Sequence, residues 1–194
     1  MKNYFSKVVF LLLLLFITRL HSQEQISIGI RGTVHTSNVS EIHVDSKALI
    51  GGSLGGSVKF PLGYDNQFYI NAELAYSMQG EKDGSIKYAQ NYVNIPIYFR
   101  AYFSEADSEF FGEIGPQIGI LVSQKNKELD EAYYGDKPQT LDLSIGAGMG
   151  YSFSRKFEIF ARYNYGLTDV YKKYQGQQRT SILGFGVTYY FNSY

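Results

Sequence analysis

The sequence contains no cysteine and no tryptophan, and only four of its 194 residues are proline. Without cysteine the chain cannot form disulfides, thiolate zinc sites, a thiol nucleophile or a lipid anchor attached through sulfur. The sequence has no excess of positive or negative charge, because its 18 Lys and Arg residues equal its 18 Asp and Glu residues in number. A nucleic-acid-binding domain would show a basic surplus. Beyond the first two dozen residues, no apolar run approaches the roughly 20 residues that a membrane-spanning helix needs.

The abundant residues are glycine, tyrosine and phenylalanine, with 20, 18 and 14 copies. Aromatic residues favour strands and glycine favours turns, so this composition predicts a β-protein. The length fits one domain.

The first segment has the three parts of a secretory signal peptide. Lys2 and Lys7 form a basic start, residues 8–17 are apolar, and a short polar stretch follows. We expect cleavage after Ser22, which gives a signal peptide of residues 1–22 and a mature domain of residues 23–194. Cleavage removes three basic residues and no acidic one, so the mature chain has 15 basic and 18 acidic residues and a net charge of −3.

After residue 25 the sequence falls into eight segments in which apolar and polar residues alternate with the period of a β-strand. At about 12 residues each, they exceed the average globular strand and match the 9–11 residues that cross a membrane at a tilt. The expected strands are residues 25–36, 49–60, 68–79, 92–103, 110–122, 141–152, 157–168 and 180–191.

The two phases of this alternation differ in chemistry. One phase is apolar and contains no charged residue in any of the eight segments. The other is rich in Gly and Ser, with one or two charges per segment. A solvent-facing surface would carry many Lys, Glu and Thr, whereas small residues suit a narrow interior on which eight strands converge. We therefore expect the apolar phase to face lipid and the polar phase to fill the interior.

The interior phase contains four basic and four acidic side chains, which allows every buried charge to be paired. The expected lumen charge network consists of Arg31, Lys59, Arg100 and Arg162 with Glu73, Glu113, Asp142 and Glu158. Equal numbers predict a polar, plugged lumen and no open channel.

The connections alternate between short ones after every second strand and longer ones at residues 37–48, 80–91, 123–140 and 169–178. Aromatic residues of the apolar phase gather at the short-turn ends: Phe60, Phe68, Phe103, Phe110, Tyr151, Phe157 and Phe191. Short periplasmic turns, long outer loops and an aromatic girdle are typical of outer-membrane proteins. The sequence thus predicts an all-β fold, an eight-stranded antiparallel up-and-down transmembrane β-barrel in the bacterial outer membrane, with both termini periplasmic.

Several local motifs point to a known family. Residues 92–100 read YVNIPIYFR, residues 112–119 read GEIGPQIG, and residues 146–151 read GAGMGY. Residues 162–169 read RYNYGLTD and residues 184–191 read GFGVTYYF. Together they resemble the small outer-membrane β-barrel family that includes PorT-type proteins. The resemblance implies the fold and the location. Some members of such families assist secretion, and the family brings no catalytic signature.

His35 and Ser37 form a weak candidate catalytic pair. They lie two residues apart on the interior phase, and this arrangement resembles that of lipid-deacylating barrels, with His as the base and Ser as the nucleophile. Glu41 or Asp45 would have to supply the orienting carboxylate. The alternative is a polar strand end that continues into a polar loop.

Other candidate sites are weaker still. His43 and Asp45 could supply two metal ligands, but two ligands do not define a metal site. Lys172, Lys173 and Arg179 make the last long connection basic, which would suit lipopolysaccharide phosphates. We expect no metal and no cofactor.

The leading interpretation is a non-enzymatic outer-membrane barrel with a polar plugged lumen. It would act through its loops in membrane integrity, adhesion or as a secretion accessory. The expected partners are outer-membrane lipids or lipopolysaccharide, together with proteins at the loops or turns, and no nucleic acid. The alternatives are a lipid A-modifying enzyme built around His35 and Ser37, a narrow porin, and a soluble periplasmic ligand carrier.

Overall fold

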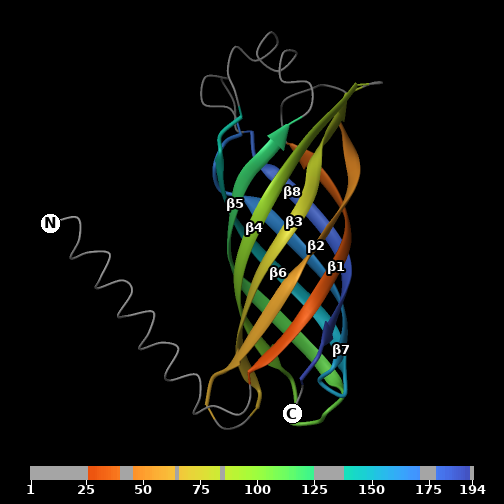
Figure 1. Ribbon diagram of the computed structural model, residues 1–194, viewed down its shortest axis with the longest axis vertical. Coiled ribbons are helices and arrows are strands. Elements are labelled where there is room, and N and C mark those ends of the chain that lie inside the picture. Colours follow the sequence, from red (N-terminus) through yellow and green to blue (C-terminus); the bar gives the residue numbers. More distant parts are fainter. Residues whose placement is uncertain are drawn as a thin grey trace, which may run out of the picture.

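The computed structural model describes residues 26–39, 46–63, 66–83, 86–124, 138–170 and 178–192. Eight strands run through them: β1 (Ser27–Val39), β2 (Ser46–Pro61), β3 (Phe68–Asp83), β4 (Ile86–Tyr102), β5 (Glu109–Gln124), β6 (Leu141–Phe153), β7 (Phe157–Gly166) and β8 (Thr180–Tyr190). Each strand pairs antiparallel with the next, and β8 pairs with β1 to close the barrel (Figure 1). The all-β, eight-stranded antiparallel fold is therefore confirmed. Among the described residues, no helix is long and apolar enough to cross a membrane.

The two phases of the alternation lie on the two faces of the barrel wall as predicted. Ile50 and Val34 point outward with 75% and 66% of their surface exposed, while Arg100 and Lys59 point inward with 0% and 1%. A soluble protein would bury the first pair and expose the second. The wall thus presents its apolar side chains to the surroundings and keeps its charged ones in the lumen.

The three short connections (residues 62–67, 103–108 and 154–156) lie at one end of the barrel, which we call the short-turn end. Aromatic side chains contact one another on the outer wall at this end: the ring centroids of Phe110 and Tyr151 are 4.9 Å apart, and those of Tyr151 and Phe153 are 4.8 Å apart. The first and last strands also meet at this end. The side-chain amide of Asn192 accepts a hydrogen bond from the Ile28 N–H and donates one to the Ile26 carbonyl.

One predicted loop is wrong. Residues 80–91 were expected to form a long connection, but β3 continues to Asp83 and β4 begins at Ile86. The two strands form a hairpin at the end opposite the short turns (Figure 1). It extends past the end of β5 on one side and stays paired with β2 as far as Ser46 on the other. A hairpin tip outside the membrane has no lipid-facing side, so no apolar phase marks it in the sequence. The other predicted strand ends are within about three residues of the observed ones.

The predicted signal peptide, residues 1–22, lies outside the described residues, as do the tips of the predicted loops at 37–48, 123–140 and 169–178.

Candidate functional site

Seven buried charged side chains meet in the lumen, and we call them the lumen charge cluster. They come from six strands: Arg31 on β1, Lys59 on β2, Glu73 on β3, Arg100 on β4, Glu113 on β5, and Glu158 and Arg162 on β7. None has more than 8% of its surface exposed. Buried charges persist only when they are paired and hydrogen-bonded, so the contacts inside the cluster decide whether the lumen is stable.

Glu113 lies at the centre of the cluster. Its Oε2 accepts hydrogen bonds from Nε and Nη2 of Arg100 at 3.1 and 2.6 Å. Its Oε1 accepts from Nε and Nη2 of Arg162 at 2.9 and 2.5 Å. Each carboxylate oxygen is thus assigned to one guanidinium, and a third guanidinium, that of Arg31, lies 3.8 Å away.

Glu158 continues the cluster toward the short-turn end. Its Oε2 accepts a hydrogen bond from Arg100 Nη1 at 2.7 Å. Its Oε1 accepts one from the Tyr102 hydroxyl at 2.7 Å and a longer one from Lys59 Nζ at 3.4 Å. Arg100 therefore bridges two carboxylates, whereas Lys59 pairs with Glu158 alone.

Glu73 ends the cluster on the other side. Its carboxylate accepts hydrogen bonds from Nη1 and Nη2 of Arg162 at 3.0 and 2.8 Å, and it forms an ion pair with Arg31. The Asn71 amide donates a further hydrogen bond to it at 2.6 Å. Two guanidinium groups thus share one carboxylate, and Arg162 links Glu73 to Glu113.

Each cation of the cluster also lies over an aromatic ring. The distances from cation to ring centroid are 3.6 Å for Arg31 and Phe160, 4.3 Å for Lys59 and Tyr190, 4.2 Å for Arg100 and Phe111, and 4.0 Å for Arg162 and Tyr98. The negative face of a ring stabilises a desolvated cation. Aromatic rings therefore supply attraction that the carboxylates alone do not provide.

Glycines of β6 and β8 make room for these rings. A Cβ on Gly150 would overlap the ring of Phe111, one on Gly186 would overlap Phe160, and one on Gly146 would overlap the Tyr98 hydroxyl. Three glycines of the interior phase thus leave space that the large side chains of the lumen occupy.

Asp142 was expected in the charge network but lies apart from it. Its two oxygens accept hydrogen bonds from the hydroxyls of Thr168 and Thr180, at 3.0 and 3.3 Å. It is the second residue of β6, at the end of the lumen far from the short turns. Alternation predicts which face a side chain occupies but not its height along the barrel. In the described lumen the cluster therefore has four cations and three carboxylates.

Arg155 closes the short-turn end of the lumen. It pairs with Glu109, and its Nη1 donates to the Asn66 carbonyl at 3.0 Å. Its Nη2 donates to the Ala106 carbonyl at 3.3 Å, and the guanidinium lies 3.7 Å from the centroid of Tyr102. One side chain thus ties all three short turns together across the barrel mouth.

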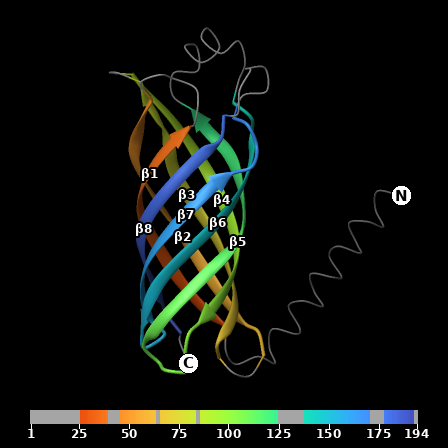
Figure 2. The same cartoon turned by 180° about the vertical axis from the view of Figure 1, so that it is seen from behind.

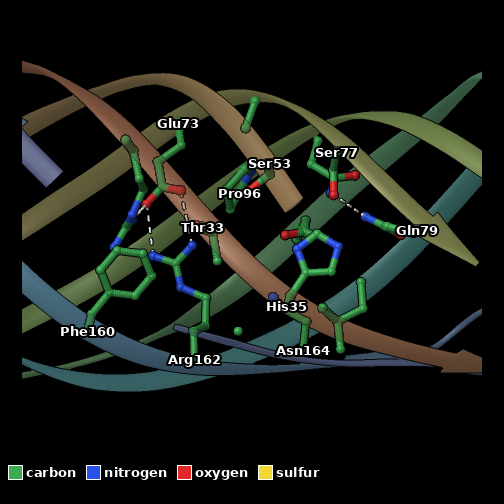
Figure 3. A pocket seen from close by; sticks show the side chains of 16 residues that line it. Thr33, His35, Ser53, Glu73, Ser77, Gln79, Pro96, Phe160, Arg162 and Asn164 are labelled. Atoms are coloured by element: carbon green, nitrogen blue, oxygen red, sulfur yellow. Dashed lines mark hydrogen bonds and ion pairs between the residues drawn. The ribbon is translucent and has the colours of Figure 1, made fainter. Parts of the chain in front are cut away.

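A small cavity remains between the cluster and the opposite end of the lumen. Its volume is about 50 Å³. Figure 3 shows Glu73, Arg162 and Phe160 at one end of the cavity and His35 and Ser77 at the other. A space of this size accommodates a few water molecules.

His35 and Ser37 both face the lumen, but each is hydrogen-bonded to the backbone of β3. His35 Nε2 donates to the Met78 carbonyl at 2.8 Å. The Ser37 hydroxyl donates to the Gly80 carbonyl at 2.8 Å and accepts from the Gly80 N–H at 2.9 Å. Neither side chain is bonded to the other, and Glu41 and Asp45, the proposed carboxylates, lie outside the described residues.

The reason for these contacts is an irregularity between β2 and β3. Their pairing shifts register between Ala48 and Gly52, which leaves backbone groups of β3 without their usual partners on β2. Buried backbone groups need hydrogen bonds. Because Gly51 has no side chain to block the way, His35 reaches across β2 to Met78. The pair thus serves as a clasp between β1 and β3.

In the part of the chain that the structure describes, no group of three or more His, Asp or Glu side chains could hold a metal ion. The weak candidate pair His43 and Asp45 lies outside it.

The profile of the outer membrane protein beta-barrel domain matches residues 21–172. The chain belongs to this family. It is accordingly an outer-membrane protein of bacteria, as the alternation and the girdle predicted. Comparison with curated protein sequences finds no match.

Three solved structures are similar to this chain over most of its length. Ail, the attachment invasion locus protein of Yersinia pestis, has a TM-score of 0.50 and 16% identity over 86% of this chain and 99% of Ail. The outer membrane enzyme PagL has a TM-score of 0.53 and 12% identity over 81% of this chain and 98% of PagL. Neisserial surface protein A has a TM-score of 0.49 and 14% identity over 86% and 97%.

Sequence reasoning missed the aromatic part of the lumen and the role of Arg155. Tyr98, Tyr102 and Phe111 have the same parity as the lumen charges of their strands, so the alternation already placed them inside. The sequence analysis assigns aromatic residues only to the girdle of the apolar phase, and it gives these three no role. Arg155 lies in a turn, where alternation predicts nothing.

Proposed function

We propose that this outer-membrane barrel is non-enzymatic and non-conducting, and that it acts in adhesion through the end opposite the short turns. The observation that carries the proposal is the lumen charge cluster, which fills the interior with paired and ring-covered charges. Such a lumen has a structural role and leaves recognition to the outer connections. With the opposite end outside the cell, the short turns and both termini face the periplasm.

The β3–β4 hairpin supports this assignment. It extends past the end of β5 at the outer end of the barrel, which is also the end where β5 stops and β8 begins. Ail, the attachment invasion locus protein of Yersinia pestis, has a similar fold. Rigid barrels that carry binding segments at one end follow the general rule that connections carry function on a stable scaffold.

The test is adhesion of cells that express the protein to plates coated with extracellular-matrix proteins. Residues 81–88 are replaced by a two-residue Asn-Gly turn, which closes the hairpin after the Gly80–Ala89 pair. The pairing that is lost with β2 is confined to residues 46–48. The control is a change at the other end, Ser108→Ala. Adhesion should fall in the hairpin variant only. The faster or slower migration of unheated samples on gels shows that both variants are folded. Full adhesion after hairpin shortening and after exchange of residues 125–137 would contradict the proposal.

The second candidate is a lipid-modifying enzyme, because PagL is an enzyme with a similar fold and His35 and Ser37 are present. The clasp argues against it, since His35 Nε2 and the Ser37 hydroxyl are both engaged by β3. Mass spectrometry of lipid A from cells that express the wild type or His35→Ala separates the two readings. A lipid A change that depends on His35 would establish the enzyme.

A narrow porin is the third reading. The cluster predicts negligible conductance in planar bilayers, and a large, stable conductance of the wild type would overturn the closed lumen.

A further inference from the structure

An apolar groove lies on the outer wall of the barrel across β6, β7 and β8. Its volume is about 610 Å³, and its floor is Ala161, which lies in register between Met149 on β6 and Phe185 on β8. Met149 and Phe185 stand out from the wall, with 65% and 63% of their surface exposed. Figure 2 shows the three strands side by side on this face. The groove therefore forms because the small side chain of Ala161 lies between the larger side chains of Met149 and Phe185.

The groove continues toward the short-turn end along Tyr151, Ile159 and Val187. All of its lining belongs to the apolar phase or to the backbone between those side chains. This wall faces hydrocarbon, where an unfilled hollow loses van der Waals contacts. The occupant must be a flexible apolar chain, because a hollow of this kind matches an acyl chain and no polar solute.

A cation lies at the short-turn end of the groove. Lys156 is exposed, and its Nζ is 5.7 Å from the ring centroid of Tyr189 on the outer wall. Tyr189 is two residues from Val187 of the groove and lies in register with Phe157. Among the described residues, no carboxylate pairs with Lys156, since Glu109 of the adjoining strand is engaged by Arg155. Lys156 and the aromatic residues beside it occupy the level at which lipid headgroups lie.

We propose that this groove and Lys156 form a binding site for an anionic phospholipid of the leaflet at the short-turn end. One acyl chain lies over Ala161 between Met149 and Phe185, and the headgroup phosphate contacts the Lys156 ammonium. The site is independent of the proposed adhesion function, because it lies on the wall and at the opposite end of the barrel.

The absence of tryptophan allows a direct test, since a single introduced Trp is the only indole in the protein. Tyr189→Trp reports on the site, and Phe68→Trp is the matched control at the same end on β3. Both proteins are refolded in vesicles with brominated phosphatidylglycerol or brominated phosphatidylcholine, and quenching gives the relative binding of the two lipids. Phosphatidylglycerol should be favoured about five-fold at Tyr189→Trp, as expected for one lysine at a membrane surface, and not at Phe68→Trp.

Two further substitutions on the Tyr189→Trp background locate the headgroup and the chain. Lys156→Gln should abolish the preference for phosphatidylglycerol. Ala161→Phe, which fills the groove, should reduce quenching by both lipids, whereas Ala147→Phe, on the lipid-facing side of β6 outside the groove, should not. Equal preference at both Trp positions, or a preference that survives Lys156→Gln, would overturn the site. Migration on unheated gels verifies that each variant is folded.

Discussion

Replacement of Glu113 by Gln tests whether the lumen charge cluster is assembled as described. Oε2 of Glu113 receives both of its hydrogen bonds from Arg100, and Oε1 receives both from Arg162. A glutamine offers one oxygen and one NH₂ group. In either orientation the NH₂ group faces a guanidinium that has only donors, so one arginine loses two hydrogen bonds and both lose the negative charge.

Glu113→Gln should lower the free energy of unfolding by about 3–5 kcal/mol. This is the range for removing one partner of a buried ion pair and leaving the other charge unpaired. Lys59→Met should behave differently. Glu158 keeps its 2.7 Å bonds from Arg100 and from Tyr102 when the lysine is removed. The cluster also changes from four cations against three carboxylates to equal numbers. Lys59→Met loses the hydrogen bond to Tyr102, the longer contact with Glu158 and the cation–π contact with Tyr190. It also removes the cost of burying an ammonium group, so we expect a net loss of only about 1 kcal/mol.

Urea unfolding of both variants in phospholipid vesicles, followed by the loss of the folded band on unheated gels, measures the two free energies. The prediction is an asymmetry, with removal of one carboxylate costing several times more than removal of one cation. Equal losses, or a larger loss for Lys59→Met, would show that Lys59 is needed for charge balance and would refute the proposed arrangement.

The same unfolding assay tests two other features. Alanine at His35 should cost about 1 kcal/mol, the value of its one hydrogen bond to β3, and alanine at Ser37, which makes two, about 2 kcal/mol. Lipid A composition should not change in either variant. Gly146→Ala places a methyl group against Asn164 and should cost about 1–3 kcal/mol through overpacking. Gly32→Ala meets no atom within 4 Å and should be tolerated; equal effects at the two glycines would contradict the packed lumen.

The fold was accessible from the sequence because a membrane-spanning strand has one face in lipid and one in the lumen. Every second residue therefore reports the side on which it lies, and the absence of charge on one phase can be seen without any structure. The same rule placed Arg31, Glu73, Glu113 and Arg162 in the lumen, where the structure brings them together.

The alternation of residues does not predict how far along the barrel axis a residue lies. That position depends on how the strands are staggered. Asp142 was grouped with the lumen charges for its phase, but its stagger places it beside Thr168 and Thr180. The clasp by His35 and Ser37 depends on a register shift between β2 and β3 that no alternation pattern shows. Long-range contacts of these kinds require the three-dimensional pairing.

The lumen charge cluster also has a consequence for how the barrel is made. Lys59 and Glu158 are 99 residues apart in the sequence, and Arg162 and Glu73 are 89 apart, so their contacts exist only after the sheet has closed. A partly inserted sheet would expose these charges to lipid at high cost. Insertion one hairpin at a time is therefore unfavourable, and closure of β1 against β8 and burial of the cluster should occur together. The charges that stabilise the finished barrel therefore favour closure of the whole sheet over gradual insertion of its strands.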